Sequence, residues 1–159
     1  MGIQLPGFLR EAQAFVGLPF PGTNESALQG RAADWNQLGS LASNALSQIS
    51  QTAQSVSSDN RGDTVDAFSE FMSSGGGNVG SLRDFQMACR SAALAHGIAA
   101  MTIRSLKMAI IAQLSIVATA INVAKAFPQA IPAAYQTRQQ AFMFIQRATQ
   151  MAAQQLRAG

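Results

Sequence analysis

The chain has 159 residues, enough for one ordinary domain, of which 48% are hydrophobic and only 12% are charged. Its single cysteine, Cys89, excludes a disulfide scaffold, and one cysteine with one histidine cannot supply the four ligands of a Cys/His metal site. Residues 1–84 contain eight acids and four bases, whereas residues 85–159 contain seven bases and no acid. These seven bases are dispersed, without the interleaved aromatic platform that stacking on bases requires, so the pattern argues against nucleic-acid binding.

The chain begins without the basic segment and apolar core of a signal peptide, so we expect any export to avoid the general secretory (Sec) route. Residues 6–16 are predicted to form a short helix, because their apolar side chains fall on one face. The Gly/Pro-rich segment 17–22 breaks this helix. Thr23 or Asn24 is then expected to cap the next helix.

Residues 25–57 are predicted to form a long helix, because apolar residues recur in alternating steps of four and three. About half of these positions are Ala or Gly, so a partner helix can approach closely. The opposite face is polar and carries no charge from Trp35 to Ser58, which indicates that other helices cover much of it. The seam expected to carry the helix packing includes Leu28, Trp35, Gly39, Leu46 and Ile49.

A turn over residues 59–63 and a short helix over residues 64–73 are predicted next. Asp63 or Thr64 is expected to cap the short helix. Residues 74–80 are expected to form a glycine-rich loop. No strand precedes these glycines and no lysine follows them, which excludes a phosphate-binding P-loop.

The longest predicted helix covers residues 82–126 and is opened by a capping box over residues 81–84. Pro128 ends it, and a last helix is expected over residues 133–157. The seam of the long helix includes Ile103, Leu106 and Ile110.

An uncharged stretch of 17 residues lies between Lys107 and Lys125. A helix that crosses a bilayer needs about 20 apolar residues. The stretch also contains polar residues such as Gln113 and Asn122, which favours a buried bundle helix over membrane insertion.

The two long helices predict an all-α fold built on an elongated antiparallel hairpin, with residues 25–57 packed against residues 82–126. In the expected register residue 58 lies opposite residue 85, and residue 28 lies opposite residue 115. The short helix 6–16 is expected to cover the overhanging residues 116–126. We expect a helical-hairpin domain over residues 1–127, and a C-terminal helix in residues 128–159 that packs back or binds a partner.

No residue pattern predicts catalysis. Cys89 and His96 are two helical turns apart, about 10 Å along the axis, which is too far for a catalytic dyad. Asp63, Asp66 and Glu70 share a face near a helix N-terminus, where the helix dipole accounts for them. We therefore expect no enzymatic activity, no cofactor and no metal.

The hairpin-turn motif consists of Arg61, Gly62, Asp63 and Phe68. Three further motifs are the lead-in 17–25, the helical Leu28…Ala32–Ala33–Asp34–Trp35, and Lys107–Met108–Ala109–Ile110–Ile111. Taken in order over residues 5–127, these four motifs resemble those of the Trp-X-Gly superfamily of type VII secretion substrates. More closely, they resemble the actinobacterial helical domains at the N-termini of large secreted polymorphic toxins.

The resemblance implies a non-enzymatic interaction or targeting module that pairs helix to helix with itself or with a small helical type VII partner. It also implies a protein that is secreted or attached to the cell envelope by a non-Sec route, after a cytoplasmic stage. The sequence departs from the family pattern in two places: Asn60–Arg61–Gly62 lacks the turn Trp of relatives, and no acid follows Tyr135 four residues later. The family's secretion signal is therefore absent or lies on a partner.

The alternative hypothesis is a membrane-acting or pore-forming helical protein. In such a protein, residues 97–127 and the basic tail would insert into or lie on an anionic membrane.

Overall fold

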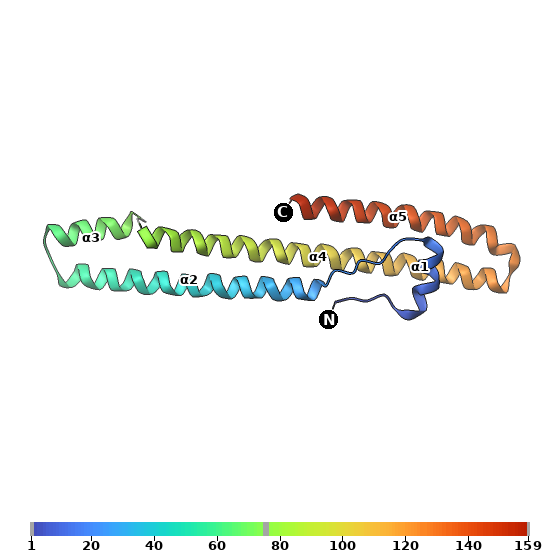
Figure 1. The fold of residues 1–159 in the computed structure, drawn as a ribbon, viewed down its shortest axis with the longest axis horizontal. Helices are drawn as coiled ribbons and strands as arrows, with labels where there is room; N and C mark the ends of the chain where they lie inside the picture. The colour runs from blue at the N-terminus through green and yellow to red at the C-terminus, as the bar shows by residue number, and fades with distance from the viewer. Residues whose placement is uncertain (1, 75–76, 159) are drawn as a thin grey trace. The chain divides into compact units, whose positions relative to one another are not determined.

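A computed structural model describes residues 2–74 and 77–158 of the chain, and the described residues are helical and connecting segments without a strand. The predicted fold class, an all-α helical hairpin, is confirmed (Figure 1). The elements in chain order are η1 (Gly7–Leu9), α1 (Arg10–Val16), α2 (Glu25–Asp59), α3 (Asp63–Ser73), α4 (Gly77–Ala126), η2 (Pro128–Ala130) and α5 (Ile131–Ala158).

The predicted helix ends at Asn24 and Pro128 are confirmed. The Asn24 Oδ1 atom accepts hydrogen bonds from the backbone N–H groups of Ser26 and Ala27, at 3.1 and 3.2 Å, and so caps α2. Phe127 adopts an extended conformation after α4, and Pro128 opens η2 as its first residue. Local side-chain chemistry therefore determines where these two helices begin and end.

The predicted caps of α3 and α4 are wrong. Neither Asp63 nor Thr64 caps α3, whose N-cap is Gly62 without a side-chain hydrogen bond. The helix α4 begins at Gly77, and Ser81 lies inside its first turns with Oγ bonded to the Gly77 carbonyl oxygen at 3.4 Å. The predicted loop 74–80 is therefore helical over residues 77–80, whereas Gly75 and Gly76 lie outside the described residues.

Gly77 explains why α4 starts earlier than predicted. Its φ of +60° is a left-handed conformation that glycine adopts without strain. A Cβ atom at this position would lie 3.2 Å from the Phe71 ring, so the residue also allows close approach of α3. Gly77, which was predicted to lie in a loop, instead permits α4 to begin beside Phe71 of α3.

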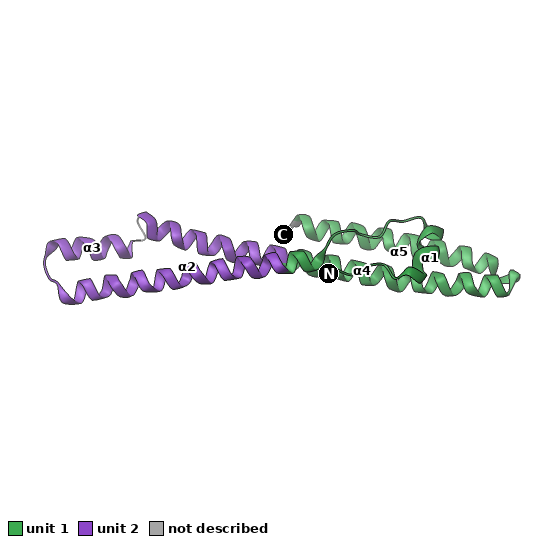
Figure 2. Cartoon of the chain, turned by 60° about the horizontal axis from the view of Figure 1, so that its bottom comes forward, with its two compact units in different colours: residues 1–29, 97–159 green, residues 30–96 purple. Residues whose placement is uncertain are grey.

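The described chain divides into two compact units (Figure 2). The terminal unit comprises residues 1–29 and 97–159, and the hairpin unit comprises residues 30–96. The helix α5 lies in the terminal unit together with α1. The predicted domain division at residues 127 and 128 stays a prediction.

The core of the terminal unit lies where α1, α4 and α5 meet. Leu9 and Val16 pack with Leu114 and Val117, and Ile145 of α5 joins the same cluster. As expected, the N-terminal helix lies on the end of α4, because Phe15 packs against this cluster and Glu11 pairs with Lys125. Leu18 and Phe20, which were expected to cover the same end, lie instead beside Ile103 and Leu106.

The hairpin unit shows that the predicted register is wrong. A Cβ atom added to Gly39 would lie 3.4 Å from the Cys89 Cβ, whereas the prediction placed residue 39 near residue 104. The Oγ atoms of Ser57 and Ser69 are 2.7 Å apart. The bend therefore lies at residues 60–62, and α3 supplies the partner of the C-terminal part of α2.

Candidate helix-pairing surfaces

A buried ion pair fixes the start of α2 to the middle of α4. The Lys107 Nζ atom lies 2.8 Å from the Glu25 Oε2 atom, and the two side chains are only 3% and 5% exposed. The ammonium also donates to the carbonyl oxygens of Ile3 and Thr23, at 2.9 and 2.6 Å. All three donor positions of the ammonium are thus occupied, as a buried charge requires.

The Glu25 carboxylate is held in its ionised form by its surroundings. The backbone N–H of Ile3 donates to its Oε1 atom, and the Lys107 ammonium donates to Oε2. Together these contacts lower the pKa of Glu25 from 4.5 to about 2, and the hydrogen bond from the Ile3 backbone has the largest effect. The N-terminal segment is therefore part of the clamp that holds this ion pair.

Sequence reasoning did not predict this ion pair, although both residues lie in motifs that carry the family resemblance. The signal was present, because Lys107 is four residues after Ile103 and three before Ile110, which places it on the buried seam. A lysine at such a position requires a buried acid, and Glu25 at the start of α2 supplies it.

The predicted seam residues of the terminal unit lie at or beside its core. Ile103 and Ile110 are buried, and Leu106 is half-buried and packs on the core cluster. Leu28, on the first turn of α2, is half-buried. These four positions line helix faces that other segments of the same unit cover.

The predicted seam residues of the hairpin unit are less covered. Gly39 is buried, but Trp35, Leu46 and Ile49 are half-buried. Among the described residues of this unit, the buried hydrophobic side chains are Ala42, Cys89 and Ala93. The interior of the hairpin unit therefore consists of small residues, which bring its helices close together but bury little apolar area.

Large apolar side chains of the hairpin unit remain exposed. Leu38 and Leu41 are three residues apart on one face of α2, and Leu41 is 57% exposed. Phe71 of α3 is 55% exposed. Phe85 and Leu94 of α4 are exposed in the same way. Exposed apolar side chains that group into one patch mark a place where another protein or a membrane binds.

The predicted hairpin-turn motif lies at the bend between α2 and α3. Arg61, Gly62 and Asp63 are exposed, and Phe68 is 36% exposed on α3. Gly62 has a φ of +124°, a conformation that glycine allows. The Asn60 side-chain amide donates to the Val56 carbonyl oxygen at 2.9 Å and so closes the end of α2.

A second surface lies on α4 within the terminal unit, on the side opposite the core. Its residues are all exposed, carry no charge and follow one another in steps of three or four. We call this surface the α4 outer face. Its residues are Ile98, Met101, Ser105, Met108, Ala112, Ile116, Thr119 and Val123.

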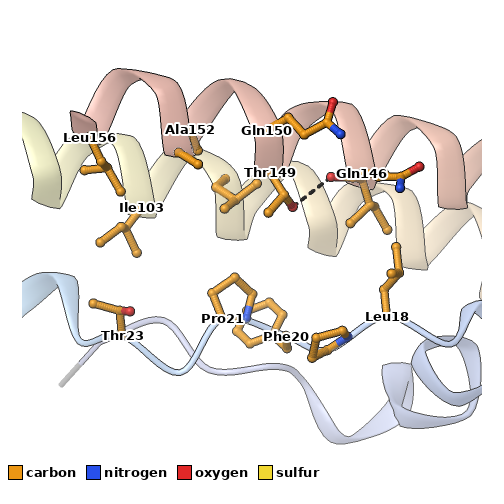
Figure 3. A pocket seen from close by; sticks show the side chains of 14 residues that line it. Leu18, Phe20, Pro21, Thr23, Ile103, Gln146, Thr149, Gln150, Ala152 and Leu156 are labelled. Carbon is orange, nitrogen blue, oxygen red and sulfur yellow. Dashed lines mark hydrogen bonds between the residues drawn. The ribbon is translucent and has the colours of Figure 1, made fainter. Parts of the chain in front are cut away.

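An apolar groove of about 520 Å³ is also present in the terminal unit (Figure 3). The connecting segment with Leu18 and Phe20 forms one wall, and Ile103 and Ala152 approach from α4 and α5. The Thr149 hydroxyl donates to the Ile145 carbonyl oxygen of its own helix at 2.8 Å. The groove therefore offers apolar surface and few polar groups for a reaction or an ion.

The described residues contain no group of three or more His, Cys, Asp or Glu side chains that could hold a metal ion. The buried thiol of Cys89 has no disulfide partner. The Nδ1 atom of His96 lies 2.8 Å from the Ala92 carbonyl oxygen of the preceding helical turn. Burial of the Cys89 thiol and the contact of His96 with its own helix are therefore explained by helix packing, without a role in chemistry.

Within the described residues, the helical chain that comprises α3 and α4 contains one stretch long and apolar enough to cross a membrane by length and composition. Only 22% of that stretch is buried. The two lysines that flank the uncharged part are both paired, Lys107 with Glu25 and Lys125 with Glu11 at 2.7 Å.

Comparison with known families gives one match that covers nearly the whole chain. The family model described as the WXG100 like domain matches residues 6–155. No curated protein and no solved structure matches the chain.

Proposed function

The chain belongs to the WXG100-like family, and on that premise we propose that it is a non-enzymatic helical module that pairs helix to helix with itself or with a small helical partner. Proteins of this family are helical, are secreted through type VII systems and typically form helical dimers. The narrower relationship to the N-terminal domains of polymorphic toxins stays a prediction.

The observation that carries the proposal is the imbalance of burial in the hairpin unit. Its buried hydrophobic residues are small, whereas leucines and phenylalanines such as Leu41 and Phe71 are exposed. A helix pair with an apolar stripe is stable only when that stripe is covered by a further layer. A second helical hairpin laid on this surface supplies the missing layer.

The charge pattern supports a protein partner for this surface. The helix α2 has no charged residue from position 36 to position 58, and its exposed residues there are mainly Ser, Gln, Asn and Thr. Neutral polar side chains can be buried against another helix with much less desolvation than charged ones. Neutral residues beside Leu38 and Leu41 can therefore be covered by a partner together with these two leucines.

The experiment is to measure association of the purified chain, and its co-purification with a small helical type VII protein, for Leu41→Lys and for Ser47→Lys. Both substitutions add one lysine to an exposed position of α2, but Ser47 is six residues away and faces a different side of the helix. We expect Leu41→Lys to weaken pairing at least tenfold, because it places a charge inside the contact. Equal pairing of the two variants, or a chain that stays monomeric and captures no helical partner, would refute the proposal.

The membrane alternative receives support from the apolar stretch of Asp63–Ala126, of which little is buried. Insertion through residues 97–127 would require the Glu25–Lys107 pair to separate. Flotation with vesicles of anionic lipid at low salt distinguishes the two functions. A chain that does not float under these conditions is not a membrane-acting protein.

A further inference from the structure

We infer that the α4 outer face is a contact surface for a second copy of this chain, joined antiparallel about a twofold axis near residue 110. This surface lies in the terminal unit and is separate from the hairpin unit on which the proposed function depends. It would give the chain a way to associate with itself that does not occupy the hairpin.

The first observation is that the α4 outer face is apolar where a solvated helix face is normally charged. Met101 is 65% exposed and Met108 is 55% exposed, with Ile116 and Val123 further along the same face. The steps of three and four residues from Ile98 to Val123 form a stripe about 37 Å long. The core of the unit lies on the other side of α4, so no segment of the described chain covers this stripe.

The second observation is the alternation of side-chain size along the stripe. In an antiparallel pair centred near residue 110, Met108 faces Ala112 of the other copy and Met101 faces Thr119. Ser105 likewise faces Ile116. Three of the four pairs thus join a large side chain to a small one, and at the ends of the stripe Ile98 faces Val123. A twofold contact needs this kind of self-complementarity.

A parallel pair does not have this fit. It would place Met101 against Met101 and Met108 against Met108, with small residues facing one another between them.

The same features favour a second copy over a lipid surface. Helices that lie on membranes carry Lys or Arg along the borders of their apolar face. The two lysines nearest to this stretch are instead held by carboxylates, Lys107 by Glu25 and Lys125 by Glu11. Among residues 98–123, Arg104 is the one basic side chain at the border of the stripe.

The test is disulfide crosslinking of the full chain in a Cys89→Ala background. Met101→Cys and Thr119→Cys are prepared as separate variants and then mixed under mild oxidation. We expect a covalent dimer in the mixture, at least tenfold more abundant than in either variant alone. A dimer of Met101→Cys alone indicates parallel pairing and overturns the inference, as does the absence of crosslinks in the mixture.

A charge substitution gives an independent readout. Ala112→Arg places a guanidinium at the centre of the stripe, whereas Gln140→Arg adds the same charge at an exposed position of α5. We expect Ala112→Arg to abolish crosslinking between the two cysteine variants, with unchanged circular dichroism, and Gln140→Arg to leave it intact. Equal crosslinking in both backgrounds overturns the inference. Vesicle binding that depends on Ala112, with no crosslinking in solution, assigns the surface to lipid and overturns it as well.

The outcome is independent of the proposed function. Leu41→Lys, which tests the hairpin surface, is expected to leave the crosslink between positions 101 and 119 unchanged. Loss of hairpin pairing with the crosslink retained removes the proposed function alone, and the reverse pattern removes this inference alone.

Discussion

Lys107 carries a positive charge into an apolar helix face, where the Glu25 carboxylate and two carbonyl oxygens surround it. We expect Lys107→Met to lower the melting temperature substantially, because it leaves a carboxylate without its cation in a buried site. The double variant Glu25→Leu/Lys107→Met is expected to recover most of the loss, since it removes both charges. Thermal unfolding followed by circular dichroism measures both.

The exposed ion pair between Lys125 and Glu11 provides the matched control. Its side chains are more than half exposed, so solvent screens their attraction. We expect Lys125→Met to change the free energy of unfolding by about 0.5 kcal/mol or less. If Lys125→Met destabilised the chain as much as Lys107→Met, burial would not be what determines how much an ion pair contributes to stability.

The low pKa of Glu25 makes stability depend on acidic pH. Because the pKa is about 2 in the folded chain and 4.5 without these contacts, the carboxylate stabilises the fold fully above pH 4.5. This contribution is lost as the pH falls from 4.5 to about 2. We expect the melting temperatures of the wild type and Glu25→Gln to differ at pH 6 and to converge toward pH 2. A difference that stays constant over this range would contradict the assigned pKa.

At the scale of elements, Gly39 sets the separation of α2 and α4 in the hairpin unit. An added Cβ would meet the Cys89 Cβ at 3.4 Å, an ordinary contact, so alanine fits but a larger side chain does not. We expect Gly39→Leu to destabilise the chain by about 1–3 kcal/mol, through overpacking between the helices. Chemical denaturation measures the change.

Gly30, on the same helix, separates packing from helix propensity. A Cβ at Gly30 meets no atom within 4 Å. We therefore expect Gly30→Leu to stabilise the chain by up to about 1 kcal/mol, because leucine is a better helix former than glycine. The account of close packing is wrong if the two leucine variants change stability in the same direction.

The contact between α1 and α4 is tested at Leu114, which is 1% exposed in the core of the terminal unit. We expect Leu114→Ala to lower the free energy of unfolding by about 3 kcal/mol, as cavities in well-packed cores do. Ile116→Ala, two residues away but exposed, is expected to change it by about 0.5 kcal/mol or less in the monomer.

The helices and most of their ends could be predicted from the sequence, because apolar periodicity and residues such as Asn24 and Pro128 act locally. The register of the hairpin could not. It depends on whether α3 takes part in pairing, and the contact between Ser57 and Ser69 that shows this joins residues on different helices. Treating residues 59–80 as one connection shifted every expected contact between α2 and α4.

The candidate surfaces were predicted in part. The spacing of apolar residues identified Gly39 and Ile110 as buried positions, because an apolar helix face packs against another segment. Periodicity does not say how fully a seam is covered, so the half-exposed state of Leu46 and Ile49 was not foreseen. Neither was the α4 outer face, whose residues lie between the seam positions and whose exposure depends on where α1 and α5 pack.

At the scale of the whole molecule, the two units differ in how they bury apolar surface. The terminal unit closes a core of its own around Leu114 and Val117. The hairpin unit keeps small residues inside and leaves large ones outside. One part of the chain therefore buries a core of large apolar side chains, whereas the other buries mainly small residues, and this difference is why we propose that another molecule supplies a further layer.

Native-state hydrogen exchange tests this division most directly, because it reports local stability along the chain. In the isolated chain at low concentration, we expect amides of residues 38–58 and 63–73 to exchange at least a hundredfold faster than those of residues 110–117. On pairing, at high concentration or with a helical partner, the first two segments should slow markedly while the third changes little. Protection of residues 38–58 in the isolated monomer equal to that of residues 110–117 would contradict the account.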